Sequence, residues 1–403
     1  MKRFSFRGTL PASKSILNRL LILQSYQPKL EIIGDSNCDD VQLMRKALKD
    51  LSEGMALDCG SAGTTFRFIT LRVSRLTAEN FLRASPRLLE RGHEELLSLL
   101  SEFQVDCELD PDGLIISSSG WRPRDLTSDE VVVEVDCMRS SQFASSVLLN
   151  AWDLKFDLKL VLKGAGVSLG YFDMTCAIVR QAGMEVKKIT DSEYLVPANQ
   201  NIVAPEMTAE PDLSSAFAIA ALGAVAGEAE IQLFPTVSSQ PDFAFVEILR
   251  QMGAEISFKG GSLHVKKSAE PLKPIEVDFR NSPDLFPVLS VLCALAEGES
   301  RLHGAPQLAY KESNRIEKSA EIVRRMGRKV ETSTDGMIIY GSSAYNFPWR
   351  AKIDPDQDHR IAMACAVAKA VGAKIEITDP SVVSKSFPEF WEVYESSFVD
   401  AEA

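Results

Sequence analysis

A lysine, an arginine and two serines are clustered near the beginning of the chain, where an amphipathic helix is expected to start. The segment reads Pro11-Ala12-Ser13-Lys14-Ser15-Ile16-Leu17-Asn18-Arg19. A proline ends a preceding strand, and a serine can cap the helix that the apolar spacing predicts. A helix start presents unpaired N–H groups and partial positive charge, to which Lys14 and Arg19 add two full charges on roughly one face. This arrangement indicates a site for an anion; the alternative is an ordinary capped helix.

Similar polar clusters occur at several further positions where helices are expected to begin. They are Gly60-Ser61-Ala62-Gly63-Thr64-Thr65-Phe66-Arg67, Arg139-Ser140-Ser141-Gln142, Asp212-Leu213-Ser214-Ser215 and Pro283-Asp284; further along the chain, Asp358-His359-Arg360 and Ser384-Lys385-Ser386 add two basic positions. Each cluster taken alone is explained by helix capping. Lys311 and Arg315 are expected to share one helical face with Glu312 beside them, for which a solvated ladder of salt bridges is the alternative.

Composition limits the classes of function. The chain has 403 residues, of which 45% are hydrophobic, so it can bury more than one core. A formal net charge of -12 argues against a general binder of nucleic acid or of acidic membranes. The longest apolar stretch, around Ala216 to Ala226, is too short to span a bilayer. We therefore expect a cytoplasmic protein with neither a nucleic-acid nor a membrane partner.

The cysteines and histidines predict neither a disulfide framework nor a metal site. There are seven scattered cysteines without a C-x-x-C pair, and four histidines without a ligand-like pair. We interpret the cysteines as mostly buried thiols in a reducing compartment. No metal ion and no cofactor are expected.

One supersecondary unit recurs along the chain. Its clearest copies are Ile178 to Val186, Ile248 to Ile256 and Ile322 to Val330, and a fainter copy follows Leu96. Each copy is predicted to be a helix followed by a strand, a turn and a second short strand. In the three clear copies a glycine ends the helix. Such repeats predict an α/β protein built from duplicated modules with mixed sheets.

The ordered set of motifs resembles the enolpyruvyl transferases, and most closely their shikimate-pathway branch. The likeness runs from Leu10 to Phe390. It rests on Pro11-Ala12-Ser13-Lys14-Ser15 with Asn18-Arg19, the loop from Gly60 to Arg67, Glu90-Arg91, Ser140-Ser141-Gln142, Ser168 with Tyr171, Asp284, Lys311-Glu312-Ser313-Asn314-Arg315, Asp358-His359-Arg360 and Lys385-Ser386-Phe387-Pro388.

The resemblance implies a two-lobed, inside-out α/β barrel in which each lobe holds three βαβαββ units. Residues 1–12 with 212–403 would form one lobe, which carries the catalytic groups on the phosphoenolpyruvate side. Residues 13–211 would form an inserted lobe that contacts shikimate 3-phosphate. The ligands would lie between the lobes, and the protein is expected to act as a monomer.

The resemblance also implies an activity, the transfer of an enolpyruvyl group from phosphoenolpyruvate to shikimate 3-phosphate by addition and elimination. The implied catalytic residues are Lys14, Asp284, Glu312, His359 and Lys385. The residues implied to bind phosphoenolpyruvate are Lys14, Gly63, Arg91, Gln142, Arg315, Arg360 and Lys385. Those implied to bind shikimate 3-phosphate are Lys14, Ser15, Arg19, Ser140, Ser141, Gln142, Ser168, Tyr171, Asp284 and Lys311. Which of Lys14, Asp284 and Glu312 moves which proton stays open.

Several positions depart from the family pattern. They are Ser61 in place of Asn, Gly92 in place of Pro, Asn314 in place of Asp, and Gln307 at a substrate-contact position. We expect Asn314 to deprive Arg315 of an anionic partner, and Gly92 to loosen the loop that carries Arg91. Together these departures predict a weakened affinity for phosphoenolpyruvate.

Two rival interpretations remain. The sister enzymes that act on UDP-N-acetylglucosamine use a cysteine shortly before an arginine that binds phosphoenolpyruvate, whereas this chain has no cysteine between Cys59 and Cys107. A non-catalytic anion-binding relative on the same fold is the other possibility. The presence of Lys14, Asp284, Glu312 and Lys385 together argues against it.

Overall fold

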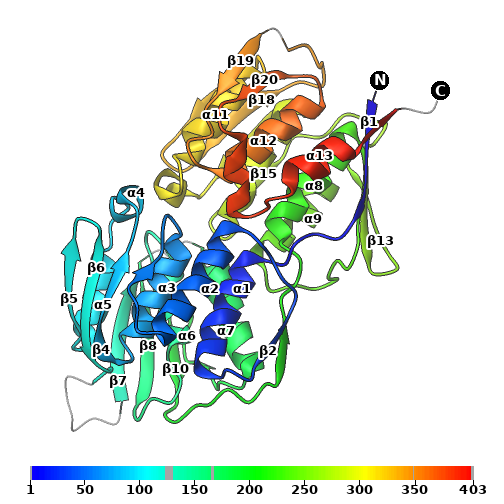
Figure 1. Cartoon of the computed structure of the whole chain (residues 1–403). Helices are drawn as coiled ribbons and strands as arrows, with labels where there is room; N and C mark the ends of the chain where they lie inside the picture. The colour runs from blue at the N-terminus through cyan, green and yellow to red at the C-terminus, as the bar shows by residue number, and fades with distance from the viewer. Residues whose placement is uncertain (1, 123–129, 165–167, 348, 401–403) are drawn as a thin grey trace. The chain divides into compact units, whose positions relative to one another are not determined.

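The computed structural model describes residues 2–122, 130–164, 168–347 and 349–400 (Figure 1). The chain divides into two compact units. Unit 1 comprises Met1–Ser13 and Glu210–Ala403, and unit 2 comprises Lys14–Ala209. Both units combine helices with sheets that contain parallel and antiparallel pairs. The prediction of an α/β fold with mixed sheets is therefore confirmed.

Unit 2 contains helices on sheets of two sizes. Its helices are α1 (Lys14–Tyr26), α2 (Asp39–Ser52), α3 (Gly63–Val73), α4 (Pro86–Leu89), α5 (Glu94–Glu102), α6 (Gln142–Leu149) and α7 (Leu169–Ala182). Its strands are β2 (Glu31–Ile33), β3 (Leu57–Asp58), β4 (Thr77–Arg83), β5 (Asp106–Asp110), β6 (Gly113–Ser119), β7 (Glu130–Asp136), β8 (Asp157–Lys163), β9 (Lys187–Lys188), β10 (Glu193–Val196) and β11 (Glu206–Thr208).

Unit 1 contains the N-terminal strand and the second half of the chain. Its strands are β1 (Lys2–Gly8), β12 (Gly227–Ile231), β13 (Glu255–Lys259), β14 (Ser262–Lys266), β15 (Glu276–Asp278), β16 (Gly298–His303), β17 (Lys329–Thr332), β18 (Met337–Gly341), β19 (Arg350–Ile353), β20 (Lys374–Ile377) and β21 (Phe398–Asp400). Its α-helices are α8 (Leu213–Ala226), α9 (Phe245–Gln251), α10 (Phe286–Leu295), α11 (Arg315–Arg325), α12 (His359–Ala370) and α13 (Phe390–Ser396). Short 3-10 helices are η1 (Pro241–Ala244), η2 (Pro283–Leu285), η3 (Pro306–Tyr310) and η4 (Pro380–Lys385).

Four sheets share one strand order, in which a parallel pair is extended by an antiparallel hairpin. The orders are β3-β4-β6-β5 and β7-β8-β10-β9 in unit 2, and β15-β16-β18-β17 and β13-β14-β12-β1-β21 in unit 1. In the last of these, β21 adds to the free edge of β1. In the described part of each unit, the remaining sheet is a parallel pair alone, β11-β2 or β19-β20.

The most apolar helices of unit 1 form its centre. Helices α8, α10 and α12 pack against one another, and nearly every residue of the three is buried. A helix that is apolar on all sides must be surrounded by other elements. The sheets supply that cover, because α8 packs on β1, β12 and β14, α10 on β16 and β18, and α12 on β20.

Glycines end the repeated helices as the sequence predicts. Gly183 follows α7 with φ 114°, Gly253 follows α9 with φ 90°, and Gly327 follows α11 with φ 76°. These left-handed conformations favour glycine, which has no Cβ to clash. A strand and a hairpin follow each glycine, so the predicted repeat is confirmed at all three places.

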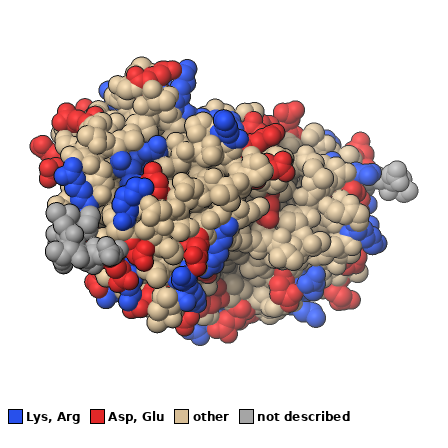
Figure 2. Space-filling view, turned by 90° about the horizontal axis from the view of Figure 1, so that it is seen from below, with Lys and Arg blue, Asp and Glu red and all other residues tan. Residues whose placement is uncertain are grey.

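On the face shown in Figure 2, acidic and basic side chains are interspersed. Within the described residues, no helix combines the length and the apolar character needed to cross a membrane. The seven cysteines are free thiols, and six of them are buried.

Candidate active site

The residues singled out in the sequence fall into a set in each unit, and most of them lie at or near the start of a helix. In unit 2 they are Lys14, Ser15 and Arg19 of α1, Gly63 at the start of α3, Arg91 between α4 and α5, Ser140, Ser141 and Gln142 around the start of α6, and Ser168 and Tyr171 around the start of α7. In unit 1 they are Asp284 in η2, Lys311 and Glu312 before α11, Arg315 at its start, His359 and Arg360 at the start of α12, and Lys385 at the end of η4.

Lys14 is the first residue of α1 and pairs with a carboxylate of the next helix. Its Nζ lies 3.0 Å from Oδ2 of Asp40, which is in the first turn of α2. The two side chains are 12% and 6% exposed. The sequence did not assign this partner, because the pairing depends on how α1 packs against α2.

Arg19 is a buried cation held by neutral groups. Its Nε donates to Oγ1 of Thr175 at 2.7 Å, and its two Nη atoms donate to the carbonyl oxygens of Ser15 and Tyr171. The residue is 2% exposed, and burial lowers the pKa of the guanidinium to about 10. A buried charge is costly without a counter-charge. The arrangement therefore suits an anionic ligand.

Two arginines and a glutamine surround the start of α3. A Cβ added at Gly63 would lie 3.3 Å from Nη1 of Arg91, so a larger residue there would press on that guanidinium. Arg67, one turn further along α3, donates to Oε1 of Gln142 at 2.6 Å, and Nε2 of Gln142 donates to Oγ1 of Thr64 at 3.2 Å. Arg67 ends a sequence motif but was not assigned a binding role.

The starts of α6 and α7 are joined through serines. Oγ of Ser141 donates to the carbonyl oxygen of Ser168 at 2.6 Å, and Oγ of Ser140 accepts from the backbone N–H of Gln142 at 3.2 Å. Ser168 has φ 59°, an uncommon conformation for a residue with a Cβ, and among the described residues its buried Oγ has no hydrogen-bond partner. Strain and an unpaired polar atom together are typical of a ligand site.

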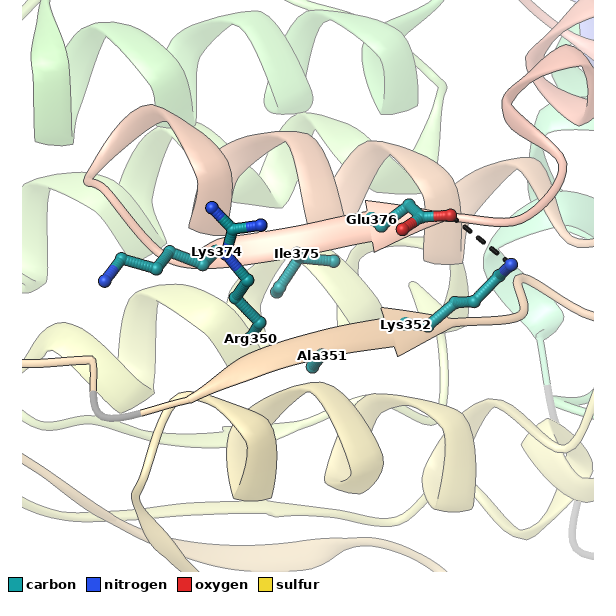
Figure 3. Close-up of a pocket in the computed structure, with 6 residues that line it drawn as sticks. All are labelled: Arg350, Ala351, Lys352, Lys374, Ile375 and Glu376. Atoms are coloured by element: carbon teal, nitrogen blue, oxygen red, sulfur yellow. Dashed lines mark ion pairs between the residues drawn. The ribbon is translucent and has the colours of Figure 1, made fainter.

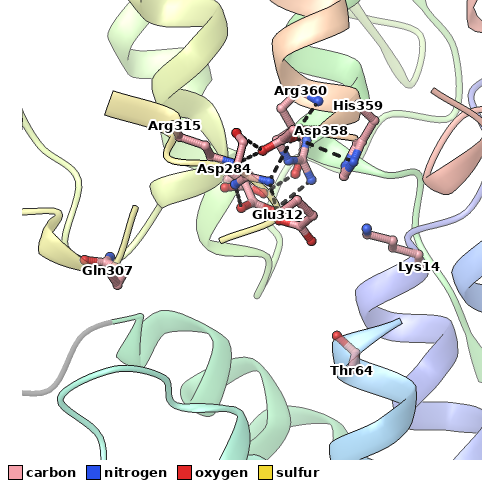
Figure 4. Close-up of polar contacts among 12 residues, drawn as sticks. Lys14, Thr64, Asp284, Gln307, Glu312, Arg315, Asp358, His359 and Arg360 are labelled. Atoms are coloured by element: carbon pink, nitrogen blue, oxygen red, sulfur yellow. Dashed lines mark hydrogen bonds and ion pairs between the residues drawn. The ribbon is translucent and has the colours of Figure 1, made fainter. Parts of the chain in front are cut away.

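In unit 1, Arg315 is surrounded by three carboxylates, as Figure 4 shows. Its Nε donates to Oδ2 of Asp358 at 2.7 Å, its Nη1 to Oδ1 of Asp284 at 2.6 Å, and its Nη2 to Oε2 of Glu312 at 2.9 Å. A second bond of Nη2, at 3.3 Å, reaches Oδ1 of Asp358. Burial by itself would lower the pKa of Arg315, but the carboxylates, Asp358 first, raise it well above its ordinary value.

Arg360 shares one of these carboxylates. Its Nη2 donates to Oδ2 of Asp284 at 2.8 Å, while among the described residues its buried Nε has no acceptor. Burial alone would raise the pKa of Asp284, but Arg360, Arg315 and Lys311 outweigh it and hold that pKa below its ordinary value. Asp284 is therefore an ionised carboxylate between two arginines.

The expected helical face from Lys311 to Arg315 is wrong. Helix α11 begins at Arg315, and the side chain of Asn314 caps it by accepting the backbone N–H of Glu317 at 3.3 Å. Lys311 therefore precedes the helix, because an Asn at this position competes for the cap. Although Asn314 is not acidic, Arg315 has three other anionic partners, since three carboxylates contact its guanidinium.

Gly92 has a conformational reason to be glycine. Its φ is 75°, which proline cannot adopt, and an added Cβ would lie 2.8 Å from Nη1 of Arg139. His93 follows, with its Nε2 2.9 Å from the carbonyl oxygen of Leu88 and its ring 4.9 Å from that of Phe66. These contacts pack the end of the loop that carries Arg91.

The remaining predicted residues are largely buried. His359 is 1% exposed, with Nδ1 3.9 Å from Oδ1 of Asp358, and Lys385 is 8% exposed. Gln307 is 2% exposed, and among the described residues its Oε1 has no hydrogen-bond donor. Figure 4 shows His359 beside Asp358 at the start of α12.

A hollow of about 490 Å³ lies elsewhere in unit 1, along β19 and β20. It is lined by Arg350, Ala351, Lys352, Lys374, Ile375 and Glu376 (Figure 3), and none of these is a predicted site residue. Lys352 pairs with Glu376 at 3.3 Å. The charged residues that line the hollow are exposed. Within the described residues, no group of three or more His, Cys, Asp or Glu is arranged to hold a metal ion.

Comparison with known proteins identifies the family. The chain is 30% identical to a 3-phosphoshikimate 1-carboxyvinyltransferase of Syntrophobacter fumaroxidans, over 96% of each chain. It is also 30% identical to one of Bacteroides fragilis, over 95% of this chain and 92% of the relative. Its fold is similar to that of an EPSP synthase from Acinetobacter baumannii, with a TM-score of 0.76, 22% identity, and coverage of 100% and 97% of the two chains. The model of the family EPSP synthase (3-phosphoshikimate 1-carboxyvinyltransferase) matches residues 6–394, and the chain belongs to that family.

Proposed function

We propose that the helix starts described above bind phosphoenolpyruvate and shikimate 3-phosphate and carry out the reaction of the family. That reaction transfers the enolpyruvyl group of phosphoenolpyruvate to the 5-hydroxyl of shikimate 3-phosphate and releases phosphate, a step of the shikimate pathway toward aromatic amino acids. The two substrates together carry two phosphates and two carboxylates. Their site must therefore concentrate cations even on a chain of net charge -12.

The observation that carries the proposal is the environment of Arg19. This buried guanidinium makes its three hydrogen bonds to neutral oxygens, and its positive charge is one that a phosphate would compensate. The strained Ser168 lies in the same unit, directly before α7, which is the helix that supplies Thr175 and Tyr171. We assign to shikimate 3-phosphate the residues Lys14, Ser15, Arg19, Ser140, Ser141, Gln142, Ser168 and Tyr171 of unit 2, with Asp284 and Lys311 of unit 1.

Phosphoenolpyruvate is assigned to a second set of cations. These are Arg315, Arg360 and Lys385 of unit 1, with Lys14, Gly63, Arg91 and Gln142 of unit 2. The buried Nε of Arg360 is a donor that an anionic ligand would satisfy.

The chemistry needs two groups that move protons. In the addition step the substrate hydroxyl loses its proton as it attacks the alkene carbon, and the methylene gains one. In the elimination step a proton leaves the new methyl group as phosphate departs. We assign Asp284 to the hydroxyl and Glu312, with Lys14, to the methyl group, and His359 and Lys385 to the departing phosphate.

Phosphate release by the purified protein tests the proposal. We expect release with phosphoenolpyruvate and shikimate 3-phosphate, no release when UDP-N-acetylglucosamine replaces the shikimate ester, and loss of release in Lys14→Ala. Release only with the sugar nucleotide would assign the chain to the sister activity. No release with either acceptor would indicate an anion-binding relative.

A matched pair of arginine variants tests the assignment of Arg19. Arg72, in α3 of the same unit, also donates to neutral oxygens and lies over an aromatic ring, but it is not assigned to the site. We expect Arg19→Met to raise the KM for shikimate 3-phosphate at least about tenfold, the effect of losing a charge-assisted hydrogen bond. Arg72→Met should leave it within about twofold. Equal effects of the two variants would remove Arg19 from the site.

Three further properties belong to the proposal. We propose that each unit is one lobe of an inside-out α/β barrel of three βαβαββ repeats, supported in unit 1 by the central helices α8, α10 and α12. The parallel pairs β19-β20 and β11-β2 would be the third repeats. We also propose a cytoplasmic location, which free and mostly buried thiols suit, and a monomer, which light scattering would show as a mass near 44.3 kDa.

A further inference from the structure

The arginine that is assigned to phosphoenolpyruvate already has carboxylates on all three of its nitrogens. Arg315 donates through Nε, Nη1 and Nη2 to Asp358, Asp284 and Glu312, at distances from 2.6 to 3.3 Å. The side chain is 1% exposed. These contacts use four of the five guanidinium N–H groups, so a further anion can bind the guanidinium through two hydrogen bonds only if one of the carboxylates leaves it.

The three carboxylates differ in how firmly they are held. Asp358 is 0% exposed and has two further partners: it accepts the backbone N–H of Arg360 at 3.0 Å and the hydroxyl of Ser313 at 3.1 Å. It also caps α12. Moving Asp358 would break all of these bonds at once, so it is a fixed partner of Arg315.

Asp284 and Glu312 lie at the more exposed side of the cluster. Their side chains are 18% and 20% exposed, and they lie outside the α-helices, in η2 and in the segment before α11. Both bind Arg315 through one oxygen each, and Asp284 uses its other oxygen for Arg360. A partly hydrated carboxylate can exchange one cationic partner for water at a lower cost than a buried one can.

We propose that Asp284 and Glu312 are exchangeable ligands of Arg315 and Arg360, which the anionic groups of phosphoenolpyruvate replace, while Asp358 stays as the residue that positions Arg315. The proposal rests on the proposed function, because it concerns the same two arginines. No covalent bond changes in this step: one carboxylate on the guanidinium is replaced by another anionic group. The displaced carboxylates are the two groups assigned to move protons.

The exchange would couple substrate binding to catalytic readiness. While two arginines and Lys311 surround Asp284, its pKa stays below the ordinary value, and such a carboxylate is a weak base. An anion that takes over the arginine donors weakens these bonds and adds negative charge nearby, and both changes raise proton affinity. The pair of Lys14 with Asp40 shows the same pattern in unit 2, where another assigned cation is paired with a carboxylate.

The test compares three variants that remove a negative charge from the same guanidinium. Steady-state phosphate release at saturating shikimate 3-phosphate gives the KM for phosphoenolpyruvate and the kcat. For Asp284→Asn and Glu312→Gln we expect the KM to fall about three- to tenfold, because a competing anion is gone, while kcat falls at least about hundredfold. For Asp358→Asn we expect the KM to rise about tenfold or more, because the guanidinium loses its fixed support.

Asp242→Asn is the control for the general electrostatic effect of removing a nearby negative charge. Asp242 is 3% exposed and contributes to the electrostatic environment of Arg360, but its carboxylate accepts from the hydroxyl of Ser214. We expect the KM of Asp242→Asn for phosphoenolpyruvate to change by less than about twofold. If this KM falls as much as that of Glu312→Gln, the effect comes from the general loss of negative charge near the arginines, and the proposed exchange is overturned.

The outcomes separate the exchange from the proposed function. An unvaried protein that releases no phosphate with the two substrates contradicts the function itself. An active protein in which Asp284→Asn and Glu312→Gln leave the KM unchanged or raise it contradicts the exchange alone. If Asp358→Asn does not fold, Ser313→Ala replaces it: loss of the hydroxyl that holds Asp358 should raise the KM about two- to threefold. An unchanged KM there would exclude a positioning role for Asp358.

Discussion

Arg315 and Asp358 form a two-bond ion pair in the interior of unit 1. Nε and Nη2 of the arginine lie 2.7 and 3.3 Å from the two carboxylate oxygens, and the side chains are 1% and 0% exposed. Such fork geometry fixes the plane of the guanidinium as well as its position. Losing one member of a buried pair leaves the other charge uncompensated, at a cost of about 3–5 kcal/mol.

Replacing Arg315 by lysine keeps the charge but removes the fork. We expect Arg315→Lys to lower kcat/KM for phosphoenolpyruvate at least about hundredfold and the free energy of unfolding by about 2–4 kcal/mol. Arg324→Lys is the matched control on the same helix, since Arg324 is half exposed and lies 3.7 Å from Glu317. Phosphate release measures kcat/KM, and urea unfolding measures the free energy of unfolding. If Arg315→Lys and Arg324→Lys change both quantities equally, the two-bond geometry of Arg315 is not needed for binding or stability.

Asn314 is expected to act through the helix cap. Asn314→Ala should lower the free energy of unfolding by about 1 kcal/mol, whereas Asn314→Asp should preserve it, because Asp also accepts the N–H of Glu317. Neither change should alter the KM for phosphoenolpyruvate more than about twofold. A much lower KM in Asn314→Asp would show that charge at this position does matter to Arg315.

Asp242 should make the protein less stable as pH rises. Burial, and then Asp284, raise its pKa to about 6, compared with about 3.9 in an unfolded chain. Between pH 4 and 6 the Asp242 carboxyl binds more protons in the folded state than in the unfolded state. Its contribution to the free energy of unfolding is therefore present below pH 4 and is lost as pH rises through 6. Asp242→Asn removes this loss, which amounts to about 2–3 kcal/mol. Urea unfolding measures this. Between pH 4.5 and 7.5, the free energy of unfolding of the variant should rise relative to that of the unvaried protein. A difference between the two proteins that does not change with pH would contradict the assignment.

His93 should act in the opposite direction. Burial, and then Arg67, lower its pKa to about 4, compared with about 6.5 when unfolded. The unfolded state therefore binds more protons between pH 4 and 6.5, so the contribution of His93 is present above 6.5 and declines as pH falls to 4. The full decline is about 3 kcal/mol. His93→Gln should flatten this part of the stability profile, and a profile as steep as that of the unvaried protein would disprove the neutral, buried imidazole.

Local features of the fold could be predicted because their causes are local. The glycine stops at Gly183, Gly253 and Gly327 follow from the need for a left-handed residue after a helix. The same logic failed at Lys311 to Arg315, where an Asn cap moves the helix start to Arg315. Two local signals compete at that position, and sequence spacing alone does not rank them.

The sequence by itself determined which residues gather at helix starts, the mixed α/β class and the family. Tertiary structure decided which charges meet. Arg315 pairs with Asp358, which is 43 positions further along the chain, and Lys14 pairs with Asp40, which is 26 positions away. Arg19, by contrast, is buried among neutral oxygens. Charge pairing falls off steeply with distance and depends on burial, so only the packing of the helices sets it. That packing distinguishes Arg315 and Lys14, which pair with carboxylates, from Arg19, which donates to neutral oxygens.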